Sequence, residues 1–120
     1  EAIRKVVFEE KRCTLQELVE ALDCDFSGKE MLQQALLDAP KFGNDNEEAD
    51  EIAVRLHEFI CQTIRNQKNR TRLDSFLAVL INNNMNVTLG QFTGATPDGR
   101  NAHKFLSNGN SLTTDRIKRD

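Results

Sequence analysis

Residues 75–81 form a continuous apolar run, SFLAVLI, which constrains the fold more than any other feature of the chain. A short run of this kind is typical of a strand that is buried on both faces of a sheet. Its periodicity alone does not distinguish it from a buried helix. A strand that is apolar on both faces needs a layer of structure on each side. We therefore expect this run to belong to a larger α/β body.

The first 70 residues carry the spacing of amphipathic helices. Thr14 and Glu17 fit a capping box, in which each side chain bonds the backbone N–H of the other residue. Ser27 is the candidate cap of the next helix. Pro40 ends that helix, because a residue before proline is pushed out of the helical region. We predict four helices, at about residues 1–12, 14–22, 29–38 and 47–69.

Apolar residues recur on one side of the last three helices, which predicts one buried face for each. The fourth helix also begins with acidic residues and ends with basic ones, which matches the helix dipole. The predicted buried residues are Leu15, Leu18, Val19 and Leu22 in the second helix, Met31, Leu32, Ala35 and Leu36 in the third, and Ile52, Leu56, Phe59, Ile60 and Ile64 in the fourth.

The chain changes character after residue 72. Residues 82–86 are rich in Asn and predict a turn, and residues 87–89 are a candidate second strand. Four helices and one or two strands do not make a closed sheet. The predicted fold class is therefore α/β, with this chain as a helix-rich segment that is incomplete on its own.

Composition excludes several classes of function. A net charge of −3 provides no field that would gather nucleic acid or an anionic membrane. No apolar run approaches the roughly 20 residues of a membrane span, and no signal-peptide pattern opens the chain. Cys13, Cys24 and Cys61 lack the spacing of a zinc site or a disulfide framework, so we expect small buried or half-buried residues. We expect a cytoplasmic location, and the initial Glu1 suggests a polypeptide cut from a longer one.

The most specific local signal is the segment GATPDGR at residues 94–100. Pro97, Asp98 and Gly99 suit the second, third and fourth positions of a tight turn, and the Thr96 hydroxyl can bond the backbone of that turn. Arg100 leaves the turn as a planar donor suited to a carboxylate or a cluster of carbonyls. Thr96, Asp98, Gly99 and Arg100 are thus the candidate site residues, in a structural or substrate loop. The alternative is a structural turn with a solvated arginine.

Other residues with catalytic or ligand chemistry do not form a recognisable set. The glycines near the end of the chain lack the spacing of a phosphate loop. His57 and His103 are far apart in sequence, and neither lies in a zinc-binding HExxH motif. The acidic residues at 45–51 lack the central Gly and terminal Glu of a calcium loop. We therefore predict no catalytic residue and no metal ligand within this chain.

Two motifs, about fifty residues apart, resemble the glycyl radical enzymes of the pyruvate formate-lyase type. GATPDGR, followed by Ala102 and by LSNGNS at residues 106–111, is similar to the late-barrel segment of that family. Residues 39–45 read APKFGND, which matches the family motif A-P-K-[YF]-G-N-D. Residues 8–18 are similar to its helix-turn-helix lead-in. The resemblance covers nearly the whole chain.

The resemblance implies a ten-stranded α/β barrel, with residues 1–120 in a single barrel domain that has a helical part at 1–70 and a strand-and-loop part at 73–112. It implies a radical lyase or dehydratase that acts on a small organic substrate. In that family a glycyl radical oxidises a cysteine to a thiyl, which abstracts hydrogen from the substrate. An iron–sulfur activating enzyme that uses S-adenosylmethionine installs the radical. The full-length protein is expected to be a homodimer.

The cysteine and glycine motifs of that chemistry are missing from these 120 residues, so the chain is expected to lie between the two catalytic loops and to be inactive alone. Most family members have Ala-Gly-Glu-Pro-Leu where this chain has AHKFL at residues 102–106. Ala95 in place of Asn favours the dehydratase and lyase members. One alternative is pyruvate formate-lyase proper (formate C-acetyltransferase). Another is a non-catalytic helical interaction module that docks through Ile52, Leu56 and Phe59.

Overall fold

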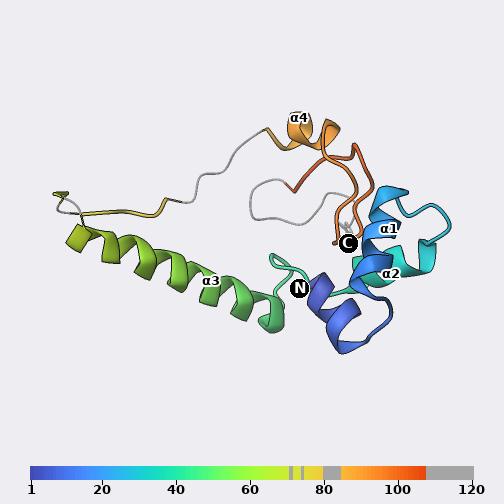
Figure 1. The fold of residues 1–120 in the computed structure, drawn as a ribbon, viewed down its shortest axis with the longest axis horizontal. Coiled ribbons are helices and arrows are strands. Elements are labelled where there is room, and N and C mark those ends of the chain that lie inside the picture. Colours follow the sequence, from blue (N-terminus) through green and yellow to red (C-terminus); the bar gives the residue numbers. More distant parts are fainter. Residues whose placement is uncertain (71, 74, 80–84, 108–120) are drawn as a thin grey trace.

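The structure, a computed structural model, describes residues 1–70, 72–73, 75–79 and 85–107. A π-helix, η1 (Arg4–Glu9), precedes the α-helices α1 (Leu15–Asp23), α2 (Glu30–Asp38) and α3 (Glu47–Asn66) (Figure 1). A 3-10 helix, η2 (Gln67–Arg70), extends α3, and α4 (Asn86–Gln91) follows. The described part of the chain is helix-rich, as predicted, and holds no β-strand. None of its helices is both long enough and apolar enough to cross a bilayer.

Helix α1 begins at the predicted capping box. The Thr14 hydroxyl accepts from the Glu17 N–H at 3.2 Å. The Glu17 carboxylate accepts in return from the Thr14 N–H at 2.7 Å. Two of the N–H groups that the start of a helix leaves unpaired are thereby satisfied.

The joint between α1 and α2 is a left-handed turn. Asp25, Phe26 and Gly28 have φ angles of +50°, +61° and +70°. This conformation costs a residue with a side chain about 1–2 kcal/mol. Burial of Phe26, which is 2% exposed, offsets that cost. Because the turn continues through Gly28, the predicted cap of α2 at Ser27 is wrong, and Lys29 takes the cap position without a side-chain bond.

The core is formed by η1, α1, α2 and the joint between the two α-helices. The predicted buried faces of α1 and α2 are half right. Leu18 and Leu36 are buried, whereas Leu15, Val19 and Met31 are exposed. The core consists of Ala2, Val6, Val7, Leu18, Ala21, Phe26, Leu36 and Ala39.

Helix α3 projects away from this core (Figure 1). Its start at Glu47 matches the prediction, and the Arg4–Glu48 ion pair ties its first turn to η1. Its predicted buried stripe is wrong for this chain, since Leu56, Phe59 and Ile60 are 58%, 66% and 41% exposed. An amphipathic helix buries its apolar stripe only where another element faces it.

Both predicted strands are wrong as far as the structure describes them. Residues 75–79 have no regular structure, and Leu77 and Val79 are 83% and 63% exposed. Leu80 and Ile81 lie outside the described residues, as does most of the turn predicted at 82–86. Residues 87–89 lie in α4. A strand needs a neighbour to pair its backbone N–H and C=O groups, and the described residues supply none.

Candidate functional site

Residues 96–99 form the tight turn that the sequence predicts. The Gly99 N–H donates to the Thr96 carbonyl at 3.0 Å, and Gly99 has a φ angle of +95°. The Thr96 hydroxyl donates to the Asp98 carboxylate. The Thr96 N–H donates to the Arg100 carbonyl at 3.0 Å, which closes the loop behind the turn. The turn is thus held by its own backbone and by two candidate side chains.

The Arg100 side chain is buried inside this loop and is 5% exposed. Its Nη1 donates to the carbonyls of Asn101 and Lys104 at 3.0 and 2.8 Å, and its Nη2 donates to the Gly94 carbonyl at 2.5 Å. Its Nε donates to the Thr96 hydroxyl at 3.1 Å. This is the expected cluster of carbonyls, and the alternative of a solvated arginine is wrong. Because the acceptors lie on both sides of the turn, the guanidinium holds residues 94–104 together.

Gly99 is the point where the loop sits on α2. A Cβ atom at Gly99 would lie 2.6 Å from Leu37 Cγ and 3.1 Å from the Gln33 carbonyl oxygen. The Gln33 side-chain amide donates to the Gly99 carbonyl and to Asn101 Oδ1, both at 2.9 Å. Gly99 therefore meets two requirements at once: the left-handed turn and the close approach to a helix.

A second attachment joins the loop to the α1–α2 joint. The Asp25 carboxylate accepts from the Ala102 N–H at 2.7 Å and from the Asn101 side-chain amide at 3.2 Å. Asn101 also donates to the Asp25 carbonyl at 3.3 Å. No motif in the sequence indicated Asp25, Gln33 or Asn101 as part of this site. Contacts between residues 66 to 77 positions apart leave no local pattern that could have revealed them.

The far end of the loop rests on α4. A Cβ atom at Gly90 would lie 2.9 Å from the Phe105 Cα. The His103 N–H donates to the Thr93 carbonyl at 3.0 Å, and the His103 Nδ1–H donates to the Gln91 carbonyl at 2.6 Å. His103 has a φ angle of +61°, a conformation that favours glycine. The ring–carbonyl bond helps to hold the histidine in that conformation.

The second motif, residues 39–45, forms the joint between α2 and α3. Ala39, which precedes Pro40, is extended and ends α2 as predicted. The Lys41 ammonium donates to the carbonyls of Leu36, Leu37 and Ala39 at 2.6, 3.0 and 3.1 Å. A cation at this place satisfies carbonyls that the helix end leaves unpaired. Both motifs therefore meet at α2, because the turn motif sits on Leu37 and this joint caps the last turn of the helix.

Cysteine and histidine side chains do not gather at the loop. Cys13 and Cys61 are half-buried as expected, whereas Cys24 is exposed. Burial, and secondly the Glu17 carboxylate, raises the pKa of the Cys13 thiol, which disfavours the reactive thiolate. His57 lies on α3 with its Nε2 3.4 Å from Cys61 Sγ. Within the described ranges, no three His, Cys, Asp or Glu side chains are arranged to hold a metal ion.

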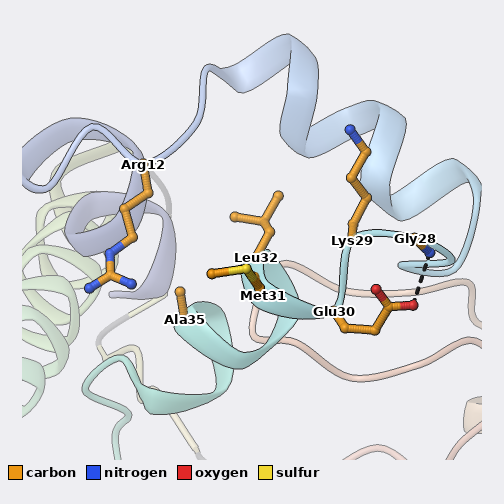
Figure 2. Close-up of a pocket in the computed structure, with 7 residues that line it drawn as sticks. All are labelled: Arg12, Gly28, Lys29, Glu30, Met31, Leu32 and Ala35. Atoms are coloured by element: carbon orange, nitrogen blue, oxygen red, sulfur yellow. Dashed lines mark hydrogen bonds between the residues drawn. The ribbon is translucent and has the colours of Figure 1, made fainter.

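A pocket of about 450 Å³ lies beside the start of α2 (Figure 2). Figure 2 shows Arg12 and Lys29 on either side of Leu32. Arg12 already pairs with Glu10 at 2.5 Å. The pocket shares no lining residue with the loop and is therefore a separate feature of the surface. The lining residues are Arg12, Gly28, Lys29, Glu30, Met31, Leu32 and Ala35.

Comparison with known proteins identifies a family. The family model described as pyruvate formate lyase-like matches residues 1–90. The isethionate sulfite-lyase of Oleidesulfovibrio alaskensis is 39% identical over 118 residues, which cover 93% of this chain and 13% of that protein. The probable dehydratase YbiW of Escherichia coli is 36% identical, with 92% of this chain and 15% of that protein covered. The B12-independent glycerol dehydratase of Clostridium butyricum, a solved structure, has a TM-score of 0.70 at 35% identity and covers 89% of this chain.

The chain spans only 13 to 15% of the length of these relatives. Within that span the likeness is both of sequence and of fold, since the solved dehydratase is similar over most of the described residues. The family model alone matches three-quarters of the chain. The chain therefore belongs to the pyruvate formate lyase-like family of glycyl radical enzymes, as its two motifs indicated.

Proposed function

We propose that this chain is a helix-rich segment of a ten-stranded α/β barrel, within one barrel domain of a radical lyase or dehydratase that acts on a small organic substrate. The observation that carries the proposal is the buried Arg100 cluster, which makes the family motif a rigid loop. The names of the relatives support the reaction class, because they are a sulfite-lyase and dehydratases. The full-length protein is proposed to be a cytoplasmic homodimer.

In such an enzyme a glycyl radical, installed by an iron–sulfur activating enzyme that uses S-adenosylmethionine, supplies the thiyl that abstracts hydrogen from the substrate. The residues of this chain have a different role. Arg100 draws three carbonyls around itself, while Thr96 and Asp98 close the turn. The loop then lines or buttresses the mouth of the barrel as a rigid wall. A rigid wall favours reaction because it holds the substrate in one orientation.

The apolar surface of the chain supports its place in a larger body. Leu56 and Phe59 on α3, and Leu77 beyond it, are each more than half exposed. Exposed apolar groups on this scale mark surfaces that another structure covers. The same face of α3 is the observation that favours the second candidate, a helical interaction module. A stable monomer of these 120 residues would support that second candidate.

Anaerobic activation of the full-length protein tests the proposal. We expect a glycyl radical signal in electron paramagnetic resonance after incubation with the activating enzyme, S-adenosylmethionine and a reductant. Isethionate and glycerol are the first substrates to test, because they appear in the names of a relative and of a solved neighbour. Pyruvate with coenzyme A tests the pyruvate formate-lyase alternative. A protein that binds its activating enzyme but forms no radical would contradict the proposal.

A further inference from the structure

We propose that Asp25 and Gln33 are positioning residues: they set where the loop of residues 94–104 lies on α2, and turnover depends on that placement. The second half of this statement rests on the proposed function, in which the loop lines or buttresses the substrate site. Neither residue belongs to a motif that the sequence singles out.

Gln33 holds the chain on both sides of the buried arginine. Its amide nitrogen has two N–H donors. It donates to the Gly99 carbonyl and to Asn101 Oδ1, each at 2.9 Å. These two acceptors directly precede and follow Arg100 in the chain. Because Gln33 is half-buried in the middle of α2, its bonds connect the arginine cluster to a helix that contributes to the core.

Asp25 holds the next residues from a different element. Its carboxylate accepts from the Ala102 N–H at 2.7 Å and from the Asn101 amide at 3.2 Å. Asp25 is itself in a left-handed conformation, with a φ angle of +50°. Such conformations persist where the surrounding structure imposes them. Here the next residue, Phe26, is buried in the core, so the joint is a fixed support for the loop.

The two attachments determine the placement of the loop, whereas Arg100 determines its internal shape. All four acceptors of the Arg100 side chain lie within residues 94–104. Neither Asp25 nor Gln33 contributes to that cluster. Removal of either side chain is therefore expected to loosen one of the two attachments of the loop and leave the arginine cluster intact.

Hydrogen exchange in the full-length protein tests the attachment directly. Asp25→Ala should raise the exchange rate of the Ala102 amide about tenfold, the value expected for the loss of one hydrogen bond. Asp25→Asn keeps an acceptor oxygen at the same place and should restore protection. The matched control is Asp23→Ala, because Asp23 ends α1 two residues earlier and is exposed.

The matched control for Gln33→Leu is Gln34→Leu, the same substitution at the next position of α2. Gln34 is exposed and, among the described residues, its amide bonds Asp38 of its own helix at 2.9 Å, so Gln34→Leu should leave the loop unchanged. Gln33→Leu should raise exchange at residues 99–102. Unchanged protection in both Asp25→Ala and Gln33→Leu would overturn the proposal.

Kinetics of the same variants separate positioning from simple stability. We expect kcat to fall about tenfold in Asp25→Ala and Gln33→Leu, with KM changed less and with the glycyl radical signal at its wild-type level. Asp25→Asn should recover kcat. Wild-type kcat in variants whose loop has lost protection would overturn the link to turnover. A wild-type protein without a radical would instead refute the proposed function, and the exchange rates alone would then decide whether Asp25 and Gln33 hold the loop.

Discussion

Arg100 is a buried cation whose side-chain acceptors are neutral oxygens. In the part of the chain that the structure describes, no carboxylate lies within 4 Å of its guanidinium. A planar guanidinium can meet several carbonyls arranged around it, whereas a lysine ammonium is a compact point donor on a flexible stem. The loop therefore requires the shape of this side chain as well as its charge.

Arg100→Lys is expected to cost about 3 kcal/mol of the local stability of the loop, because two or more buried carbonyls lose their donor. The measurement is hydrogen exchange of the amides at residues 96–103 in the full-length protein. Electron paramagnetic resonance should still show the glycyl radical. Lys104→Ala is the control, since it removes an exposed cation from the same loop. Wild-type protection and turnover in Arg100→Ala would contradict the role given to this residue.

His103 has a φ angle of +61°, a conformation that suits glycine. His103→Ala keeps the left-handed backbone and loses the bond from the ring to the Gln91 carbonyl. His103→Gly loses that bond as well but relieves the backbone strain. The glycine variant should therefore be more stable than the alanine variant by about 1 kcal/mol. Thermal unfolding of the two full-length variants measures the difference, and an alanine variant at least as stable as the glycine variant would contradict it.

At the scale of the elements, α2 is where the two motifs meet. Gly99 packs against Leu37 of this nine-residue helix, and Lys41 caps the last turn of the same helix. Ala95 of the loop also packs against the core to which α2 contributes. A displacement of α2 would thus move both motifs together.

Alanine substitutions at three glycines test the close contact between Gly99 and α2, because they should lower the stability of the protein by different amounts. Gly94→Ala should be nearly neutral, because a Cβ atom there meets nothing within 4 Å. A Cβ atom at Gly28 also meets nothing within 4 Å, but the alanine would have to adopt a left-handed conformation. Gly28→Ala should therefore lower the stability by about 1 kcal/mol. Gly99→Ala adds a clash with Leu37 and the backbone of α2, for a total of about 3 kcal/mol. The melting temperatures of the three variants should decrease in that order. Equal decreases for the Gly28 and Gly99 variants would contradict the close contact between Gly99 and α2.

The capping box of α1 should make that helix sensitive to acid. Hydrogen bonds from the Thr14 backbone N–H, and then from its hydroxyl, lower the pKa of the Glu17 carboxyl. A group whose pKa is lower in the folded state stabilises the fold above its unfolded pKa, and that contribution is lost as the pH falls through the folded pKa. The advantage of wild type over Glu17→Gln should therefore be present at neutral pH and decrease as the pH falls below about 4, the ordinary pKa of a glutamate carboxyl.

Urea unfolding of the full-length wild type and of the Glu17→Gln variant measures this effect. The quantity compared is the urea concentration at the midpoint of unfolding, at pH 7 and at pH 3. Glu20→Gln on the same helix is the matched control, because Glu20 lies outside the capping box. A difference in urea midpoint between wild type and Glu17→Gln that increases as the pH falls would contradict this role of the capping box.

At the scale of the whole molecule, the chain is extended for its length. Its radius of gyration is 17.2 Å, whereas a compact domain of 120 residues has about 13.6 Å. Helix α3 projects from the core (Figure 1). Its apolar side chains Leu56 and Phe59 are exposed to solvent. Such an arrangement buries little apolar surface, so the hydrophobic contribution to stability exceeds the conformational entropy cost of folding by only a small margin.

The isolated chain is therefore expected to be only marginally stable. Its thermal unfolding, followed by circular dichroism in a preparation shown to be monomeric, should be broad and centred below about 50 °C. Charged substitutions on α3, such as Phe59→Glu, should change that transition little, because Phe59 is 66% exposed here. In the full-length protein the same substitution should be strongly destabilising. A sharp monomeric transition well above 50 °C would contradict this expectation.

The local structure of the chain follows from its sequence. The capping box at Thr14, the end of α2 before Pro40 and the turn at residues 96–99 each depend on side chains within a few positions of one another. The burial of Arg100 also follows in part, because a rigid turn aims the guanidinium at nearby carbonyls. The sequence also indicated the family, because each of its two motifs is a short contiguous segment.

The burial of the apolar faces and the attachment of the loop depend on contacts between segments that are far apart in the sequence. The apolar stripe of α3 and the run at 75–79 have the spacing of buried elements, yet Leu56, Phe59, Leu77 and Val79 are exposed, because burial requires a facing partner that the described residues do not supply. The attachment of Asn101 and Ala102 to Asp25 joins residues more than seventy positions apart. A local pattern records the conformational preference of a segment, whereas the choice of partner depends on how the whole chain packs.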